Sequence, residues 1–295
     1  MSLKLQGLSF SAIAWMVLVA SLWLPPIEAH VQLAVLSPVI LLLGVPHGAL
    51  DTVFVRQLMR TPSAAQWILF AIAYLAAAAS VVVLWVLAPG LFLATFLLVS
   101  AFHFSGDPEG ETPPWFRMLY GGAIIFCPLT LHAAEVFTIF ALLAGEQSAG
   151  AIVSALQWIA WPWLAAMGIA AIATAKLNLV RSIELVSIAA LLSFLPPLIG
   201  FTLFFCAMHG VRHVLRTRDY SHAGTLRHLF YIAAGPMLAT VAGVAIAWWL
   251  SDGKPLDMRL AQLLFVGLAA LTVPHMIVIE RVRLTGWVLG RRIAK

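Results

Sequence analysis

Apolar runs long enough to cross a lipid bilayer recur along almost the whole chain. A helix needs about 20 mostly apolar residues to span the hydrocarbon core. The pattern therefore predicts about ten transmembrane helices with no soluble domain between them. The expected spans are residues 8–24, 31–55, 65–87, 91–106, 117–143, 151–173, 182–195, 197–215, 229–250 and 259–280.

The composition is that of an integral membrane protein. Hydrophobic residues make up 62% of the chain and charged residues only 10%, against about a quarter charged in soluble domains. We expect an all-α, polytopic membrane helical bundle that forms a single transmembrane domain over residues 1–295. The net charge of +5 does not indicate nucleic-acid binding, because excess Lys and Arg in a membrane protein mark its cytoplasmic loops.

The distribution of basic residues predicts the orientation. With ten spans and a cytoplasmic N-terminus, fourteen of the 17 Lys and Arg residues lie on the cytoplasmic side. Lys254 and Arg259 lie on the other side, and Arg212 lies within a span. Since cytoplasmic loops are rich in Lys and Arg, we expect both termini in the cytoplasm and a multi-pass protein of the inner (plasma) membrane.

Histidines are the main ionisable residues inside the expected spans, where such groups are rare and usually functional. His47, His103, His209, His213 and His275 lie in four spans that all run from outside to inside, each towards the cytoplasmic end. At about 1.5 Å rise per residue, they share one layer within roughly 15 Å of the inner surface. This shared depth predicts a common site.

The spacing of these histidines suits a metal centre. HGVRH places His209 and His213 one turn apart on one helix face, which suits two ligands of one metal. His47 and His103 would complete a four-histidine site, and imidazole suits zinc, copper, iron or nickel. His275 is left open between a ligand, a substrate-pocket residue and a structural residue.

Two aspartates follow two of these histidines at the same spacing. Asp51 comes four residues after His47, and Asp107 four residues after His103. Metal-bound histidines usually donate their second N–H to a carboxylate or carbonyl. Each aspartate is therefore expected either to orient the histidine before it or to contact a helix end.

Three further polar residues are expected to lie near the site or between helices. We expect Arg212 to pair with an aspartate such as Asp51 or Asp107, or to extend towards the inner surface. His132, with Glu135 in the stretch LTLHAAEVF, is expected beside the site or in a contact between helices.

Four motifs occur in an order that resembles a known family: GVPHGALD at 44–51, FHFSGD at 102–107, HGVRH at 209–213 and VPHM at 273–276. With the middle segment 127–145, they make the chain similar to the Brp/Blh family of membrane-bound β-carotene dioxygenases. The resemblance extends from about residue 40 to about residue 280.

This resemblance implies an activity and a cofactor. It implies cleavage of β-carotene, or a related carotenoid, at its central double bond with O2 to give two molecules of retinal. It implies non-haem Fe(2+) held by His47, His103, His209 and His213. It also implies a membrane-lipid environment and hand-off of the product to a rhodopsin, with no nucleic-acid partner.

Other functions use the same residue types. A transporter or proton pathway could be lined by these histidines, although such proteins tend to show broken helices or repeats at mid-bilayer. A di-iron histidine-box oxidoreductase would need more close histidine pairs than HGVRH supplies. A carotenoid-binding protein without catalysis would keep an apolar tunnel and lose the metal.

Overall fold

The described part of the chain is helical throughout. The computed structural model describes residues 1–59, 62–221 and 225–283, and no strand occurs among them. Arg60, Arg291, Arg292 and Lys295, which contribute to the predicted orientation, lie outside the described residues. The all-α prediction is therefore confirmed for the described residues, and the cytoplasmic placement of both termini remains a prediction.

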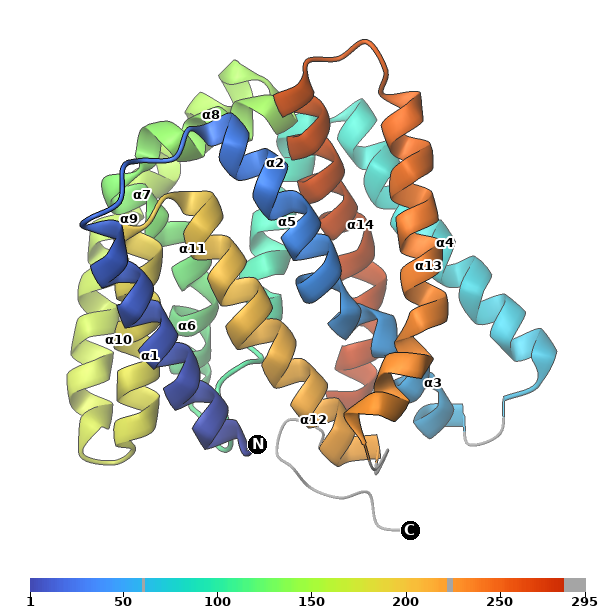
Figure 1. The fold of residues 1–295 in the computed structure, drawn as a ribbon, viewed down its shortest axis with the longest axis horizontal. Coiled ribbons are helices and arrows are strands. Elements are labelled where there is room, and N and C mark those ends of the chain that lie inside the picture. The colour runs from blue at the N-terminus through green and yellow to red at the C-terminus, as the bar shows by residue number, and fades with distance from the viewer. Residues whose placement is uncertain (60–61, 222–224, 284–295) are drawn as a thin grey trace.

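Helices follow one another with short connections (Figure 1). In chain order they are α1 (Leu3–Ser21), α2 (Ala29–Val39), η1 (Ile40–Gly44), η2 (Val45–Leu50), α3 (Asp51–Met59), α4 (Ala64–Leu87), α5 (Pro89–Phe104), α6 (Pro114–Phe126), α7 (Pro128–Leu131), α8 (Ala133–Ala144), α9 (Glu146–Ala175), α10 (Leu179–Phe194), α11 (Pro197–Leu203), η3 (Phe204–Gly210), α12 (Val211–Ser221), α13 (Leu226–Leu250) and α14 (Leu256–Arg283).

Several helices are long and apolar enough to cross a membrane. Within the described ranges seven helical segments pass by length and composition, or up to eight if one bent pair is a single span. The short apolar helix α5 is additional to these. Each expected span falls on one or more helical segments, which is consistent with a multi-pass membrane bundle. The number ten is not confirmed.

The bent pair lies on the expected span 117–143, where the length of the span and Pro128 favour a kink or tilt. The segment α6–α7 turns by 116° into α8. The turn falls at His132, whose backbone is non-helical (φ −123°, ψ 32°), rather than at Pro128, which begins α7. As a result α8 lies at the end of the bundle opposite the N-terminus (Figure 1) and packs against α5, α9 and α14.

Helix α14 occupies the centre of the packing. It contacts α2, α3, α4, α5, α8 and α13. Helices α4 and α13 expose most of their apolar side chains, including Leu69, Leu75, Leu238 and Trp249. Apolar side chains on the outside of an apolar helix face lipid in a membrane protein. We therefore expect the outer faces of α4 and α13 to contact lipid.

Two segments of non-α helix pack against each other inside the bundle. η1 and η3 are π-helical and η2 is a 3₁₀ helix with Pro46 in its first turn. Gly44 of η1 allows close approach, since a Cβ there would lie 2.3 Å from the ring of Phe205 in η3. π-Helical turns are frequent at functional sites. η1 directly precedes the 3₁₀ helix that carries His47, and η3 contains His209.

Candidate metal centre

Five histidines from five helical segments converge in the interior. They come from η2, α5, η3, α12 and α14 and are His47, His103, His209, His213 and His275. The ring centroids of His47 and His209 are 4.7 Å apart, those of His103 and His209 are 4.5 Å apart, and those of His213 and His275 are 5.1 Å apart. The four predicted ligands therefore meet in space, and His275 lies among them.

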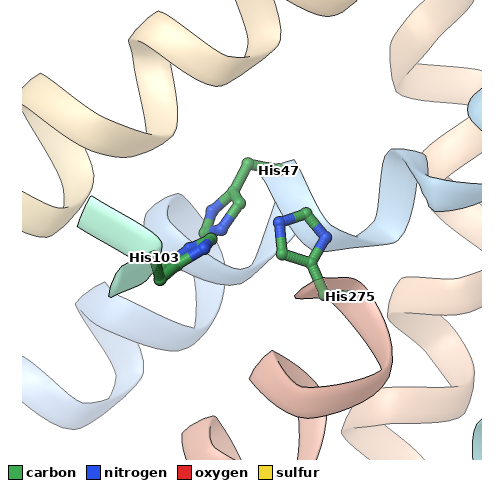
Figure 2. Close-up of side chains that lie close together, drawn as sticks. All are labelled: His47, His103 and His275. Carbon is green, nitrogen blue, oxygen red and sulfur yellow. The ribbon is translucent and has the colours of Figure 1, made fainter. Parts of the chain in front are cut away.

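Three of these rings bring their nitrogens closest together. His47, His103 and His275 each offer one nitrogen, and these atoms lie within 4.8 Å of one another. Figure 2 shows the three rings reaching towards one another from separate ribbons. This places His275 beside the nitrogens of His47 and His103, which sequence spacing alone did not decide.

His209 is oriented by a carboxylate. Its Nδ1 donates to both oxygens of Asp107, at 2.9 and 3.1 Å. Both side chains are buried. The other nitrogen, Nε2, is also buried and has no hydrogen-bond partner among the described residues. A histidine held in this way presents Nε2 to a metal, because the carboxylate fixes both the tautomer and the ring orientation.

His275 repeats this arrangement on another helix. Its Nδ1 donates to Asp51 at 2.7 Å, and Asp51 also accepts a hydrogen bond from the hydroxyl of Tyr74 at 3.0 Å. Nε2 of His275 is buried and without a hydrogen-bond partner in the part of the chain that the structure describes. His209 and His275 therefore expose the same nitrogen to the same interior space.

The rings of His47 and His103 are also held at Nδ1. His47 Nδ1 donates to the carbonyl of Gly44, in the preceding π-helical turn. His103 Nδ1 lies 2.9 Å from the sulfur of Met276, the residue after His275. A carbonyl that takes the Nδ1 proton leaves Nε2 of His47 free of a proton and able to bind a metal.

The predicted partners of the two aspartates were wrong. Asp51 does not bind His47, and Asp107 does not bind His103; their partners are His275 and His209. The local backbone explains both errors. Residues 45–50 form a 3₁₀ helix, in which the fourth residue along is rotated away from the first. α5 ends at Phe104, so Asp107 lies beyond the helix face of His103.

Arg212 pairs with a residue that the sequence analysis did not single out. Its guanidinium donates to both oxygens of Glu184 at 2.8 and 3.1 Å, and to Gln6 at 2.9 Å. The prediction of an aspartate partner was wrong, although Arg212 does donate to the backbone carbonyl of Asp107 at 3.3 Å. Arg212 is 1% exposed and Glu184 is 7% exposed. A buried arginine needs such a partner, and that need was the signal that could have indicated Glu184.

Arginines also hold the loop that carries Asp107. Arg216 donates to the carbonyls of Gly106 and Asp107 at 2.8 and 2.6 Å. Arg117 donates to carbonyls of Ser105, Gly110 and Thr112. These charge-assisted bonds fix the backbone of the loop and therefore the position of the Asp107 carboxylate.

His132 and Glu135 pair with each other. Nδ1 of His132 lies 2.9 Å from the Glu135 carboxylate, and that carboxylate side chain is 48% exposed. The pair lies at the turn between α7 and α8. Neither residue lies among the side chains that the structure brings to the histidine cluster.

The cluster borders a small pocket. The pocket holds about 420 Å³, including its opening, and its walls include His103, Asp107, His209, His213 and His275. The donors are imidazoles, and the Nε2 atoms of His209, His213 and His275 are buried. The carboxylates of Asp107 and Asp51 bind Nδ1 of His209 and His275. This donor set fits a borderline transition metal such as iron, zinc or copper.

Comparisons with known proteins agree on one family. Residues 38–282, which include all five histidines, match the family model described as "Beta-carotene 15,15'-dioxygenase". A curated protein of that name from uncultured marine bacterium 66A03 is 26% identical over 257 residues, which cover 82% of this chain and 90% of that protein. No solved structure matches.

Proposed function

This chain belongs to the beta-carotene 15,15'-dioxygenase family, and we propose that it cleaves β-carotene, or a related carotenoid, at the central double bond with O2. The observation that carries the proposal is the buried cluster of His47, His103, His209, His213 and His275 within the matched residues. A relative of this chain carries the same name. A carotenoid dissolves in lipid, so an enzyme within the bilayer can take it directly from there.

The metal is proposed to be Fe(2+). His47, His103, His209 and His213 would hold it, as the sequence analysis expected, and we add His275 because its Nε2 is presented in the same way as that of His209. Iron supplies the oxygen chemistry. The chain itself orients the imidazoles through Asp107 and Asp51.

The overall reaction balances without a further reactant. The central C=C bond breaks, and each of its two carbons takes one oxygen atom of O2 to become an aldehyde. One β-carotene and one O2 therefore give two retinal molecules. The protein needs no acid, base or nucleophile for this balance. Its tasks are to position the double bond and to keep water out of the site.

The remaining expectations complete the proposal. We place the single transmembrane domain, residues 1–295, in the plasma membrane with both termini in the cytoplasm, on the strength of the Lys and Arg distribution. The histidine cluster then lies towards the cytoplasmic side. Retinal is released into the bilayer, where a retinal-binding membrane protein such as a rhodopsin can take it up.

Expression in cells that accumulate β-carotene tests this function. The pigment is extracted and analysed for retinal, beside a His209→Ala variant with equal protein in the membrane. We expect loss of colour and appearance of retinal with the wild type alone. Retained colour in both would overturn central cleavage, and equal retinal in both would remove the histidine cluster from the chemistry.

A further inference from the structure

A second cavity, larger and almost wholly apolar, lies on another side of the histidine cluster. It encloses about 730 Å³, including its opening, within the range of about 300–1,000 Å³ typical of ligand pockets. We call it the apolar cavity. Its walls are Leu93, Phe96, Leu97, Ser100, Phe104, Ile124, Ile125, Pro128, Val136, Ile139, Phe140, Leu143, Pro197, Leu198, Phe201 and Phe265.

One wall of the apolar cavity is formed by α8. Val136, Ile139, Phe140 and Leu143 of this helix line it, at the spacing of a single helix face. The chain enters α8 through the 116° turn at His132, and residues on both sides of the turn, Ile124 and Val136 among them, line the cavity. The helix that follows the break therefore supplies one wall of the cavity.

Two helix faces run from the apolar cavity into the histidine cluster. On α5 the cavity residues Phe96 and Ser100 are followed by His103, seven and three residues later. On the helix that starts with α11, the cavity residue Phe201 is followed by Phe205 and then His209, each four residues on. These spacings keep the residues on one side of each helix.

The wall between the two spaces is made of aromatic rings. Phe104 lines the apolar cavity, and its ring centroid is 4.8 Å from that of His209. Phe201 stacks on Phe205 at 5.3 Å, and Phe205 stacks on His209 at 5.8 Å. One ring, Phe104, therefore separates the cavity from His209 on the α5 side, and two rings, Phe201 and Phe205, separate them on the other side.

We propose that the apolar cavity binds one half of the carotenoid, with the hydrocarbon end against α8 and the chain running along α5 towards the histidines. This rests on the proposed function for the identity of the hydrocarbon. The cavity's polar lining is minimal, so it suits an unsubstituted hydrocarbon end better than a hydroxylated one, whose polar group would lose its hydrogen bonds on burial.

In this arrangement the α8 wall would set the cleavage position. Leu93 at the far end and His103 at the cluster are ten residues apart on α5, which corresponds to about 15 Å of helix. That is comparable with half the length of an extended carotenoid. A hydrocarbon end resting against α8 would therefore bring the central double bond to the histidines.

Neighbouring leucines on α5 provide the test and its control. Leu97 lines the apolar cavity, whereas Leu98 is 68% exposed on the outer face. Purified wild type, Leu97→Trp and Leu98→Trp are incubated with β-carotene without O2, and the bound pigment is measured after removal of excess. Filling the cavity should lower pigment affinity about tenfold or more in Leu97→Trp alone, with equal iron content in all three proteins.

The outcomes separate this inference from the proposed function. Equal pigment binding in Leu97→Trp and Leu98→Trp would overturn the cavity assignment, and so would a wild type that binds no β-carotene or holds only lipid acyl chains there. Selective loss in Leu97→Trp supports the assignment even if the wild type forms no retinal with O2, in which case the proposed cleavage would fail instead.

A second variant tests whether α8 sets the cleavage position. It removes side-chain volume from the cavity wall instead of adding it. Phe140→Ala removes a ring from the α8 wall and enlarges the cavity there. The hydrocarbon end should then slide further in, and cleavage should yield aldehydes of unequal length in addition to retinal. If Phe140→Ala binds β-carotene with wild-type affinity and forms retinal as its sole product, contact with α8 does not set the cleavage position.

Discussion

Asp107, in the loop after α5, accepts a hydrogen bond from Nδ1 of His209 in η3, with its two oxygens at 2.9 and 3.1 Å. Asp107→Asn removes the charge that holds the ring. Loss of such a partner typically lowers metal affinity or activity by about 10- to 100-fold. We expect the iron dissociation constant of the purified variant to rise by that amount, as measured by titration against a chelator.

The matched control for this change is Asp252→Asn. Asp252 carries the same carboxylate on a side chain that is 85% exposed. The Asp252→Asn protein should have the same iron dissociation constant as the wild type. Equal iron affinity in Asp107→Asn and Asp252→Asn would show that the Asp107 carboxylate does not position His209 for a metal.

His275→Ala should lower the iron content of the purified protein. Its Nε2 is buried beside the nitrogens of His47 and His103, and its loss also leaves the buried Asp51 with the hydroxyl of Tyr74 in place of two partners. Elemental analysis per chain is the measurement, with the exposed His30→Ala as control. Full iron content with reduced retinal formation would instead assign His275 to the substrate pocket.

Arg212→Met should destabilise the fold strongly. It leaves Glu184 buried without its charge partner, and breaking a buried pair costs about 3–5 kcal/mol. The control is Arg218→Met, whose partner Asp219 has a side chain 59% exposed and whose pair contributes about 1 kcal/mol or less.

The free energy of unfolding in detergent measures both changes. The double variant Arg212→Met/Glu184→Leu should recover part of the loss, because no unpaired charge remains buried. If Arg212→Met and Arg218→Met prove equally stable, the buried pair does not support the fold as described.

Gly44→Ala should disturb the packing behind the cluster. The added Cβ would lie 2.3 Å from the ring of Phe205, which stacks on His209. Overpacking of this kind costs about 1–3 kcal/mol, and iron affinity should fall with it. Gly168→Ala is the control, since its Cβ would meet nothing within 4 Å. A Gly44→Ala protein as stable as Gly168→Ala would refute the close approach of η1 and η3.

The histidine cluster was predictable because depth in a membrane can be calculated from sequence. A constant rise per residue and the alternation of spans placed all five histidines in one layer, and the structure brings them together. The hydrophobic pattern likewise placed each expected span on a helix. These inferences need only the distance of each residue along its helix axis.

Rotation about the axis was not predictable. The partners of Asp51 and Asp107 depend on a 3₁₀ turn at residues 45–50 and on the end of α5 at Phe104, and neither is visible in an apolar pattern. The position of the turn at His132 is likewise not visible in an apolar pattern. Glu184 was missed because its own position near a span end does not show whether the charge is solvated or buried; the signal lay in Arg212, an arginine within a span that needs a carboxylate partner.

The stoichiometry of product formation by the purified, iron-loaded protein tests the central claim most directly. β-Carotene is supplied with O2, and its loss and the retinal formed are measured together, with and without iron and in His209→Ala. We predict two retinal molecules for each β-carotene consumed, with neither consumption nor product when iron or His209 is removed. Consumption without retinal, or retinal formed equally by His209→Ala, would contradict central cleavage at the histidine cluster.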